Sequence, residues 1–245
     1  MDNVPRIERL RHDTVRRNLT VAATTRLSPV MLRLTLAGPE LAGFLSASPD
    51  DHVKLIVPDG AGGQAMRDYT PRRFDPVALT LEIDFAIHDA GPATIWALGA
   101  KPGDPVTIGG PRGSQVINGP VANWLLIGDE TALPAIGRRI EEMPPDMPVT
   151  SLVSVPGKAD EQRIDTRADH TALWVHRDDP ADPVPLRKAL SHVDLPSRCF
   201  VWIAAEARVA RAVRDDLTQR GLGRGWMKAA GYWVAGQADS SDKNL

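Results

Sequence analysis

The stretch NWLLIGDETALPAIGRRIEE, residues 123–142, joins a continuous apolar run to a helical pattern, and this junction decides the fold class. The run at 123–128 does not alternate between apolar and polar residues, which is typical of a strand buried on both faces. After the polar break, Leu133, Ile136 and Ile140 recur at the spacing of one helix face. A doubly buried strand that leads into an amphipathic helix predicts a parallel sheet with helices on its faces.

The same rhythm continues towards the C-terminus. Apolar runs predict further buried strands, at 149–155 (VTSLVSV), 172–176 (ALWVH) and 199–205 (CFVWIAA). The segment 206–221 predicts a helix that ends at Gly221, since glycine favours helix termination. A last strand in WMKAAGYWVAG closes the sheet. We therefore expect an α/β domain with a parallel, doubly wound sheet over residues 119–236.

Upstream of residue 119 the chain has the pattern of short strands separated by turns. The expected strands are LTVAATTRL (19–27), VMLRLTL (30–36), HVKLIVP (52–58), ALTLEIDFAI (78–87) and PVTIGGPRG (105–113). In ALTLEIDFAI, apolar residues such as Ile83 alternate with Glu82 and Asp84, which predicts one buried and one solvated face. We expect an antiparallel β-barrel over residues 12–118, and a disordered tail at 237–245.

Bulk composition narrows the class of protein. The 245 residues can bury a sizeable core, and a net charge of −2 gives no reason to expect a nucleic-acid partner. The one cysteine, Cys199, excludes an intramolecular disulfide and a cysteine-built metal site, and we read it as a buried small hydrophobe. The N-terminus lacks a signal-peptide pattern, and no apolar run reaches the roughly 20 residues of a membrane span. We expect a cytoplasmic protein with no resident metal.

The segment MRDYTPRRFD, residues 66–75, is the first candidate ligand site. Arg67 can form a fork with phosphate, Tyr69 offers a flat ring, and Thr70 offers a hydroxyl group. Together these groups suit an aromatic heterocycle that is attached to phosphates. The alternative is a charged hairpin end in solvent.

Two further segments carry helix starts that can hold an anion. In HDAGPATIWA, Gly91 forces a turn and Thr94 lies where a helix begins; the alternative is a plain strand-to-helix connection. In GDETALPAI, Thr131 can cap the following helix, although Asp129 and Glu130 would repel a phosphate placed close to them. That segment is either a ligand site or a capped helix start.

The motifs RDYTPR, DFAIHDAGPATIWA, KPGDPVTIGGPRGS, GDETALPAI, WVHR and GYW, in this order, resemble those of the siderophore-interacting protein family. The resemblance runs from about residue 12 to residue 236. It implies a ferredoxin reductase-like fold, in which an antiparallel Greek-key FAD-binding barrel precedes a parallel-sheet nicotinamide-nucleotide domain. It also implies an FAD-dependent reductase that passes electrons from NADH or NADPH to a ferric siderophore, because a flavin accepts two electrons and releases them singly.

The resemblance implies roles for individual residues. Tyr69 would stack on the flavin, Thr70 would hydrogen-bond near its N5 edge, and Arg67 would hold the phosphates; Tyr69 and Thr70 are the catalytic candidates. The remaining FAD candidates are Asp84, Ala86, His88, Ala93 and Thr94. The residues expected to border the nicotinamide nucleotide are Gly128, Asp129, Glu130, Thr131, His176, Arg177, Glu206 and Trp233. Those expected in a basic substrate pocket are Lys54, Arg72, Arg73 and Lys228.

The chain also departs from the family pattern. GYWVAG stands where the family has an ending with two basic residues, which puts the charge of the preferred siderophore in question. Ala205 stands where the family has a glycine, and its methyl group could crowd the close approach of the backbone to the nucleotide. Arg177 and Arg208 are both possible partners for the extra phosphate of NADPH. We expect a monomer. The alternatives are a flavin reductase or electron-transfer flavoprotein with another acceptor, and a flavin- or siderophore-binding protein without turnover.

Overall fold

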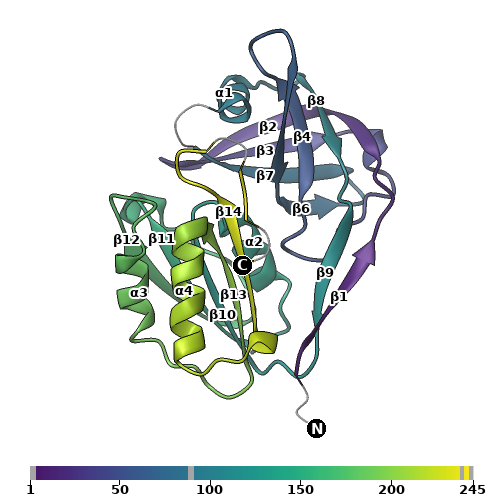
Figure 1. Cartoon of the computed structure of the whole chain (residues 1–245). Helices are drawn as coiled ribbons and strands as arrows, with labels where there is room; N and C mark the ends of the chain where they lie inside the picture. Colours follow the sequence, from purple (N-terminus) through teal and green to yellow (C-terminus); the bar gives the residue numbers. More distant parts are fainter. Residues whose placement is uncertain (1–3, 88–90, 238–239, 243–244) are drawn as a thin grey trace. The chain divides into compact units, whose positions relative to one another are not determined.

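The computed structural model describes residues 4–87, 91–237, 240–242 and 245. The chain divides into two compact units, Glu8–Val116 and Met1–Ile7 with Ile117–Leu245. We describe each unit by itself (Figure 1).

The unit Glu8–Val116 is built on a curled antiparallel sheet of seven strands in the order β5-β4-β8-β2-β3-β7-β6. The strands are β2 (Arg16–Ser28), β3 (Met31–Ala37), β4 (Val53–Pro58), β5 (Gln64–Tyr69), β6 (Pro71–Asp75), β7 (Thr80–Ala86) and β8 (Pro105–Gly109). The 3-10 helix η1 (Pro39–Leu41) and the helix α1 (Pro92–Gly99) complete the unit. The predicted antiparallel strand architecture of this half is confirmed.

The alternation predicted for β7 holds on its apolar side and fails on its polar side. Leu81, Ile83 and Phe85 are fully buried in the core of the sheet, as the period of two requires. Asp84, which the pattern places in solvent, is only 4% exposed. The prediction is wrong at Asp84 because Arg33 lies directly opposite it on β3 and covers its carboxylate.

The segment 66–75 lies in the sheet and is not a hairpin end in solvent. Residues 66–69 belong to β5, which pairs with β4, and residues 71–75 form β6, which pairs with β7. Because β5 and β6 are the two outer strands of the sheet, their charged side chains can reach solvent while the backbone stays hydrogen-bonded in the sheet. Thr70 is the link between these two strands.

The second unit contains a parallel sheet of five strands in the order β12-β11-β10-β13-β14. The strands are β10 (Asn123–Asp129), β11 (Pro148–Val155), β12 (Asp169–His176), β13 (Cys199–Glu206) and β14 (Met227–Trp233). The helices are α2 (Leu133–Glu141), η2 (Lys158–Asp160), α3 (Val184–Leu190), α4 (Ala207–Gln219) and η3 (Arg224–Trp226). The predicted α/β architecture is confirmed, although α3 was missed by the sequence pattern.

Two apolar layers cover the parallel sheet. On one face, Trp124 and Leu126 of β10 pack with α2 residues such as Ile136. On the other face, Leu125 and Ile127 pack with apolar residues of α3 and α4. The run NWLLIG is therefore buried on both faces, as expected. The strand β12 differs from its prediction: all eight of its residues are exposed or half-buried, because β12 is an outer strand of the sheet.

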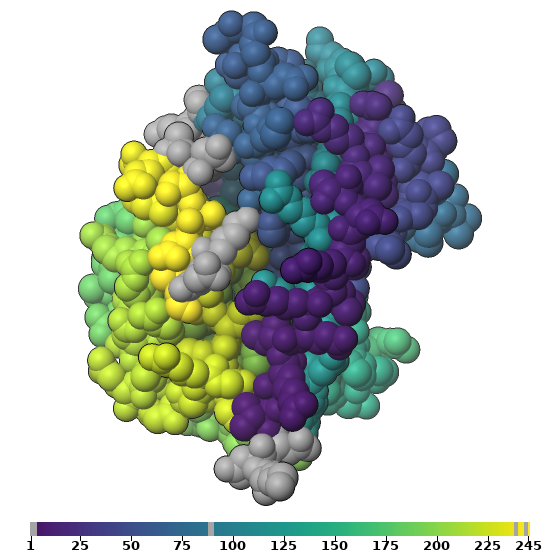
Figure 2. Space-filling model, turned by 45° about the vertical axis from the view of Figure 1, so that its right-hand side comes forward, coloured from purple at the N-terminus to yellow at the C-terminus, as the bar shows by residue number. Residues whose placement is uncertain are grey.

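The chain ends add two features that the sequence pattern did not predict. The strand β1 (Arg6–Arg11) pairs with β9 (Gly113–Asn118), and all six of its residues are exposed on the surface (Figure 2, purple). The prediction of a disordered tail differs from the structure at Asp242, which pairs with Gly231 through two backbone hydrogen bonds. Across the described ranges, the structure contains no helix long and apolar enough to span a membrane.

Candidate functional site

Tyr69 lies at the end of β5 and is held on two sides. Its ring packs on the buried ring of Phe85 with 4.3 Å between ring centroids, and its hydroxyl hydrogen-bonds to the side chain of Thr94 on α1. Burial raises the pKa of Tyr69 above its ordinary value, although Arg67 and the Thr94 hydrogen bond oppose the shift. The phenol is therefore neutral at physiological pH, and its half-buried ring has a fixed orientation.

The two other candidates in this segment flank Tyr69. Side chains alternate along a strand, so Arg67 and Tyr69 project to one face of β5 and Asp68 to the other. Arg67 donates from Nη1 to the carbonyl of Met66 at 2.9 Å. Thr70, in the link to β6, is only 8% exposed. Arg67, Tyr69 and Thr70 thus lie close together at the end of β5 and in its link to β6.

The amino end of α1 lies beside Tyr69. The helix begins at Pro92, which has no N–H group, and the preceding Gly91 supplies no side-chain cap. Ala93 and Thr94 are both buried in the first turn. A helix end without a side-chain cap favours an anion, which is consistent with the predicted place of a diphosphate.

Asp84 belongs to a buried cluster of charges. Arg33 binds it with both ends of its guanidinium group, at 2.6 and 2.8 Å, and Arg72 Nε lies 3.9 Å from its Oδ2 atom. Arg33 also pairs with Glu82 at 3.1 Å. The carboxylate of Asp84 is therefore paired with the guanidinium groups of Arg33 and Arg72. Ala86, at the end of β7, is half-buried, and His88 lies outside the described residues.

The candidate substrate residues of this unit occupy different environments. Lys54 Nζ lies 2.9 Å from the carboxylate of Asp68 on the neighbouring strand. Arg72 is 7% exposed and points into the Asp84 cluster, whereas Arg73 is exposed. The structure therefore does not gather these three cations into one basic surface.

In the second unit, Asp129 at the carboxyl end of β10 organises three segments. Its Oδ1 atom accepts hydrogen bonds from the Thr131 backbone N–H at 2.9 Å and hydroxyl at 2.5 Å. Its Oδ2 atom accepts from the Glu206 N–H and the Trp233 Nε1–H, both at 2.9 Å. Asp129 is 1% exposed. Asp129, Thr131, Glu206 and Trp233 therefore form one cluster at this edge of the sheet.

Thr131 acts differently from the prediction, and Glu206 has a role that was not predicted. Thr131 does not cap α2, because Ala132 is the N-cap and the Thr131 hydroxyl donates to Asp129. The buried side chain of Glu206 caps α4 by accepting from the N–H groups of Arg208 and Val209. Both of these contacts are local, two or three residues apart, whereas the bonds from Glu206 and Trp233 to Asp129 join residues that are distant in sequence.

Gly128 is needed for the close packing of β10, α2 and β13. A Cβ atom at this position would lie 2.6 Å from Ala132 Cβ and 2.6 Å from the Ala204 carbonyl oxygen. Ala205, by contrast, is buried among the apolar residues that face α3 and α4, so its methyl group lies in the core. The expected crowding of a nucleotide by Ala205 is therefore wrong as a direct contact.

Glu130 and Arg177 form a buried ion pair at the ends of β10 and β12. Arg177 Nη2 donates to the Glu130 carboxylate, and its Nε donates to Ser154 Oγ at 3.2 Å. Desolvation, followed by the nearby charge of Asp129, raises the pKa of Glu130 to about 7, while Arg177 opposes the shift. Arg177 is therefore already engaged within the unit.

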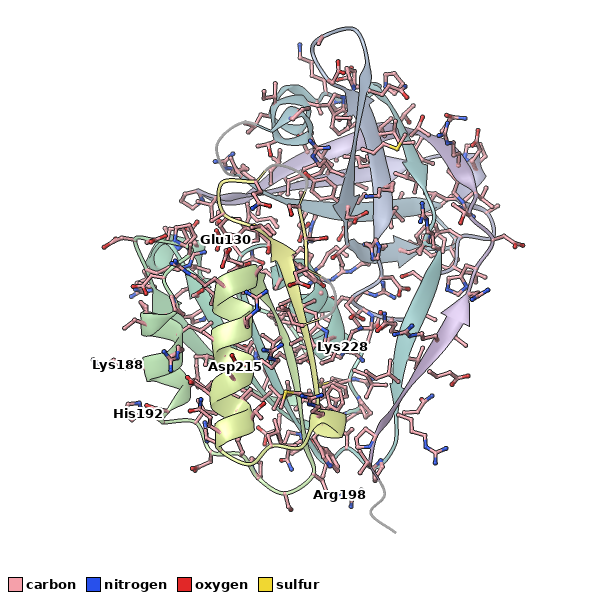
Figure 3. The ribbon with its side chains drawn as sticks, in the orientation of Figure 1. Glu130, Lys188, His192, Arg198, Asp215 and Lys228 are labelled. Carbon is pink, nitrogen blue, oxygen red and sulfur yellow. The ribbon has the colours of Figure 1, made fainter. Side chains whose placement is uncertain are left out.

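The remaining nucleotide and substrate candidates are spread around the second unit. His176 hydrogen-bonds to Glu161 at 2.8 Å, and the exposed Arg208 donates twice to the carbonyl of Ala181. Lys228 lies near the start of β14, whereas Glu130 lies at the carboxyl edge of the sheet (Figure 3). The five residue steps from Lys228 to Trp233 span roughly 16 Å of strand, so Lys228 is not part of the Asp129 cluster.

Sequence reasoning missed Arg33, Asp68 and Ser154, which neutralise or hold predicted site residues. Arg33 carries one signal, a lone charge within the apolar run VMLRLTL, but its partner depends on strand register. No cluster of three or more His, Cys, Asp or Glu side chains suited to a metal ion occurs among the residues that the structure describes.

Comparison with known proteins follows the same division of the chain. A family model described as "Siderophore-interacting FAD-binding domain" matches residues 20–65 and 60–115. A second, described as "Siderophore-interacting protein", matches residues 121–236.

Individual relatives cover nearly the whole chain. The NADPH-dependent ferric-chelate reductase of Escherichia coli is 33% identical over 96% of this chain and 100% of its own length. A siderophore utilization protein from T. fusca is 37% identical, with a TM-score of 0.88 over 98% of this chain and 100% of its own. The ferredoxin reductase of a carbazole 1,9a-dioxygenase, 19% identical with a TM-score of 0.69 over 87% of this chain and 68% of its own, shares the fold.

The motif order, the antiparallel sheet followed by a parallel sheet, and these full-length similarities agree. This chain belongs to the siderophore-interacting protein family.

Proposed function

We propose that this chain is an FAD-dependent ferric-siderophore reductase that takes electrons from NADPH or NADH and releases ferrous iron in the cytoplasm. It is similar over 96% of its length to a protein named as an NADPH-dependent ferric-chelate reductase, which supports this proposal. We further propose that residues 12–118 hold FAD, that residues 119–236 hold the nicotinamide nucleotide, and that the protein acts as a monomer.

One observation carries the cofactor assignment. The neutral, oriented ring of Tyr69 is joined by a hydrogen bond to Thr94 in the first turn of α1. A flat aromatic surface next to a helix end without a side-chain cap fits a ligand that combines a heterocycle with a diphosphate. Arg67, on the same face of β5 as Tyr69, supplies a cation for that diphosphate.

The second unit fits a nucleotide at the carboxyl edge of its sheet. The strand order changes direction between β10 and β13, and ligands of open α/β sheets bind at such a point. The carboxylates beside that point already have partners within the unit: Asp129 is buried and accepts four hydrogen bonds, and Glu130 pairs with Arg177. The expected repulsion of a phosphate is thereby reduced.

The bound flavin supplies the redox chemistry, because it takes up two electrons together and releases them singly. This chain's residues position it. Tyr69 fixes the plane of the ring, and Thr70, which is nearly buried, presents a hydroxyl group that can donate or accept a hydrogen bond at the ring edge. For this electron transfer, no side chain of the chain needs to act as a nucleophile or a general base.

An anaerobic titration tests the proposal in steps. The purified protein should bind FAD, NADPH or NADH should bleach the flavin absorbance, and a ferric siderophore with a ferrous-iron trap should restore it. Failure to bind FAD would refute the proposal. Bleaching without reoxidation by iron would indicate another acceptor, and FAD binding without bleaching would indicate a binding protein.

The Thr70→Ala variant tests the assigned ring-edge contact. Stopped-flow absorbance should show slower flavin reduction, while most FAD stays bound because Arg67 and Tyr69 are unchanged. Thr80→Ala, on β7 of the same unit, is the matched control and should reduce at the wild-type rate. Wild-type kinetics in Thr70→Ala would remove Thr70 from this role.

A further inference from the structure

The ion pair between Lys54 and Asp68 is imposed by strand register. Lys54 on β4 and Asp68 on β5 are directly opposed residues of an antiparallel ladder, so their side chains share one face. Lys54 Nζ lies 2.9 Å from Asp68 Oδ1, and the two side chains are 39% and 27% exposed. A substrate that approaches Lys54 therefore meets a paired charge.

The strand on the other side of Lys54 leaves this pair unobstructed. Lys54 also lies opposite Gly109 of β8, which has no side chain to compete with Asp68. A Cβ atom built at Gly109 would lie 3.9 Å from Lys54 Cβ. Lys54 therefore has the carboxylate of Asp68 on one neighbouring strand and a glycine, Gly109, on the other.

The arginine cluster of the same unit is balanced in a similar way. Arg33 contacts Glu82 and Asp84, at 3.1 and 2.6 Å, and Arg72 lies 3.9 Å from Asp84. Two arginines thus meet two carboxylates. Of the candidate substrate cations in this unit, Lys54 and Arg72 each have a carboxylate within ion-pair distance.

We propose that Asp68 is a specificity-determining residue: by pairing with Lys54 it adapts the reductase to ferric chelates of low net charge and discriminates against polyanionic ones. This inference rests on the proposed function. A neutral ferric tris-hydroxamate meets no electrostatic penalty at the pair. A trianionic ferric tris-catecholate gains little from a lysine whose charge is offset, and it is repelled by the carboxylate.

The charge balance predicts opposite effects for the two members of the pair. Asp68→Asn keeps the size of the side chain and unmasks Lys54, so kcat/KM for the tris-catecholate chelate should rise about fivefold at low salt. Lys54→Met leaves Asp68 without this cation and should lower that value by a similar factor. The double variant should return close to wild type, because both charges are gone. Values for the tris-hydroxamate chelate should change less than those for the tris-catecholate chelate in each variant, because the tris-hydroxamate chelate carries no net charge.

The kinetic experiment uses the full-length FAD-loaded protein, both chelates and a ferrous trap, at low and high salt. Asp13→Asn, which makes the same change in net charge elsewhere in this unit, is the control and should behave as wild type. The electrostatic gain should shrink as salt rises, since mobile ions screen exposed charges. FAD content and thermal stability are measured for every variant to confirm folding.

Several outcomes would overturn the inference. An unchanged tris-catecholate kcat/KM in Asp68→Asn would do so, as would an equal gain in Asp13→Asn or a double variant whose value stays as far above wild type as that of Asp68→Asn alone. If Asp68→Asn does not fold, an unchanged value in Lys54→Met has the same force. Failure of the proposed function itself is distinct, because the wild-type flavin would then be reoxidised by neither chelate.

Discussion

Replacing Asp129 by asparagine should cost the second unit several kilocalories per mole of folding free energy. The Asp129 carboxylate accepts four hydrogen bonds, two on each oxygen, and is 1% exposed. An asparagine has one acceptor oxygen, so in either amide orientation two of these donors would face an NH2 group. Hydrogen bonds to a charged group contribute about 1.5–3 kcal/mol each, so we expect a loss of roughly 3–6 kcal/mol.

That loss is a large part of a typical folding free energy of about 5–15 kcal/mol. One effect opposes it: Asp129 raises the pKa of Glu130, so removal of its charge makes ionised Glu130 less unfavourable. The net change should therefore lie towards the lower end of the range.

Urea denaturation followed by tryptophan fluorescence measures this change in the relevant unit. Five of the six tryptophans belong to that unit, Trp96 being the exception. Asp165→Asn is the matched control, because the Asp165 side chain is 88% exposed and the change in charge is the same. It should unfold as wild type does. An Asp129→Asn midpoint equal to that of wild type and of the control would refute the reasoning from hydrogen-bond counting.

The pairing with Trp233 provides an internal check. Trp233→Phe removes one donor to Asp129 and keeps an aromatic ring, so it should be less destabilising than Asp129→Asn. Because the two residues share a hydrogen bond, the double variant should lose less than the sum of the single losses. Strict additivity would show that the contact contributes nothing to folding.

Three further predictions concern packing, buried charge and pH. Gly128→Ala should destabilise by about 1–3 kcal/mol in urea, because its methyl group would lie 2.6 Å from two neighbouring atoms; Gly157→Ala, with open space around it, should not. Arg33→Met should cost about 3–5 kcal/mol by uncovering a buried carboxylate, and adding Asp84→Asn should restore part of the loss; an unchanged urea midpoint in Arg33→Met would contradict this. The pKa of Glu130, raised to about 7 from an ordinary 4.5, means that the folded state binds the proton more tightly than the unfolded state. Folding stability should therefore fall by roughly 3 kcal/mol between about pH 4.5 and pH 7, and Glu130→Gln should flatten that slope in melting curves; an equal slope would refute the assignment.

Much of the architecture follows from local pattern. The period of two in ALTLEIDFAI places Leu81, Ile83 and Phe85 in the core, and the unbroken run NWLLIG has an apolar layer on each side. Motif order was sufficient to identify the family, because each motif is local. The candidates Arg67, Tyr69 and Thr70 come together for the same reason: they are neighbours on one strand and its link.

Only the tertiary structure decided which partner each charged side chain has. Arg33 pairs with Asp84, and Lys54 with Asp68, through strand register. Asp129 accepts a hydrogen bond from Trp233, which lies 104 positions away in the sequence. The sequence by itself determined which face each strand presents, since alternation is a property of the local backbone. It could not determine what lies opposite, because strand order and register arise from contacts between distant segments. The physical consequence is that two predicted ligand groups, Lys54 and Asp84, carry charges already offset within the fold.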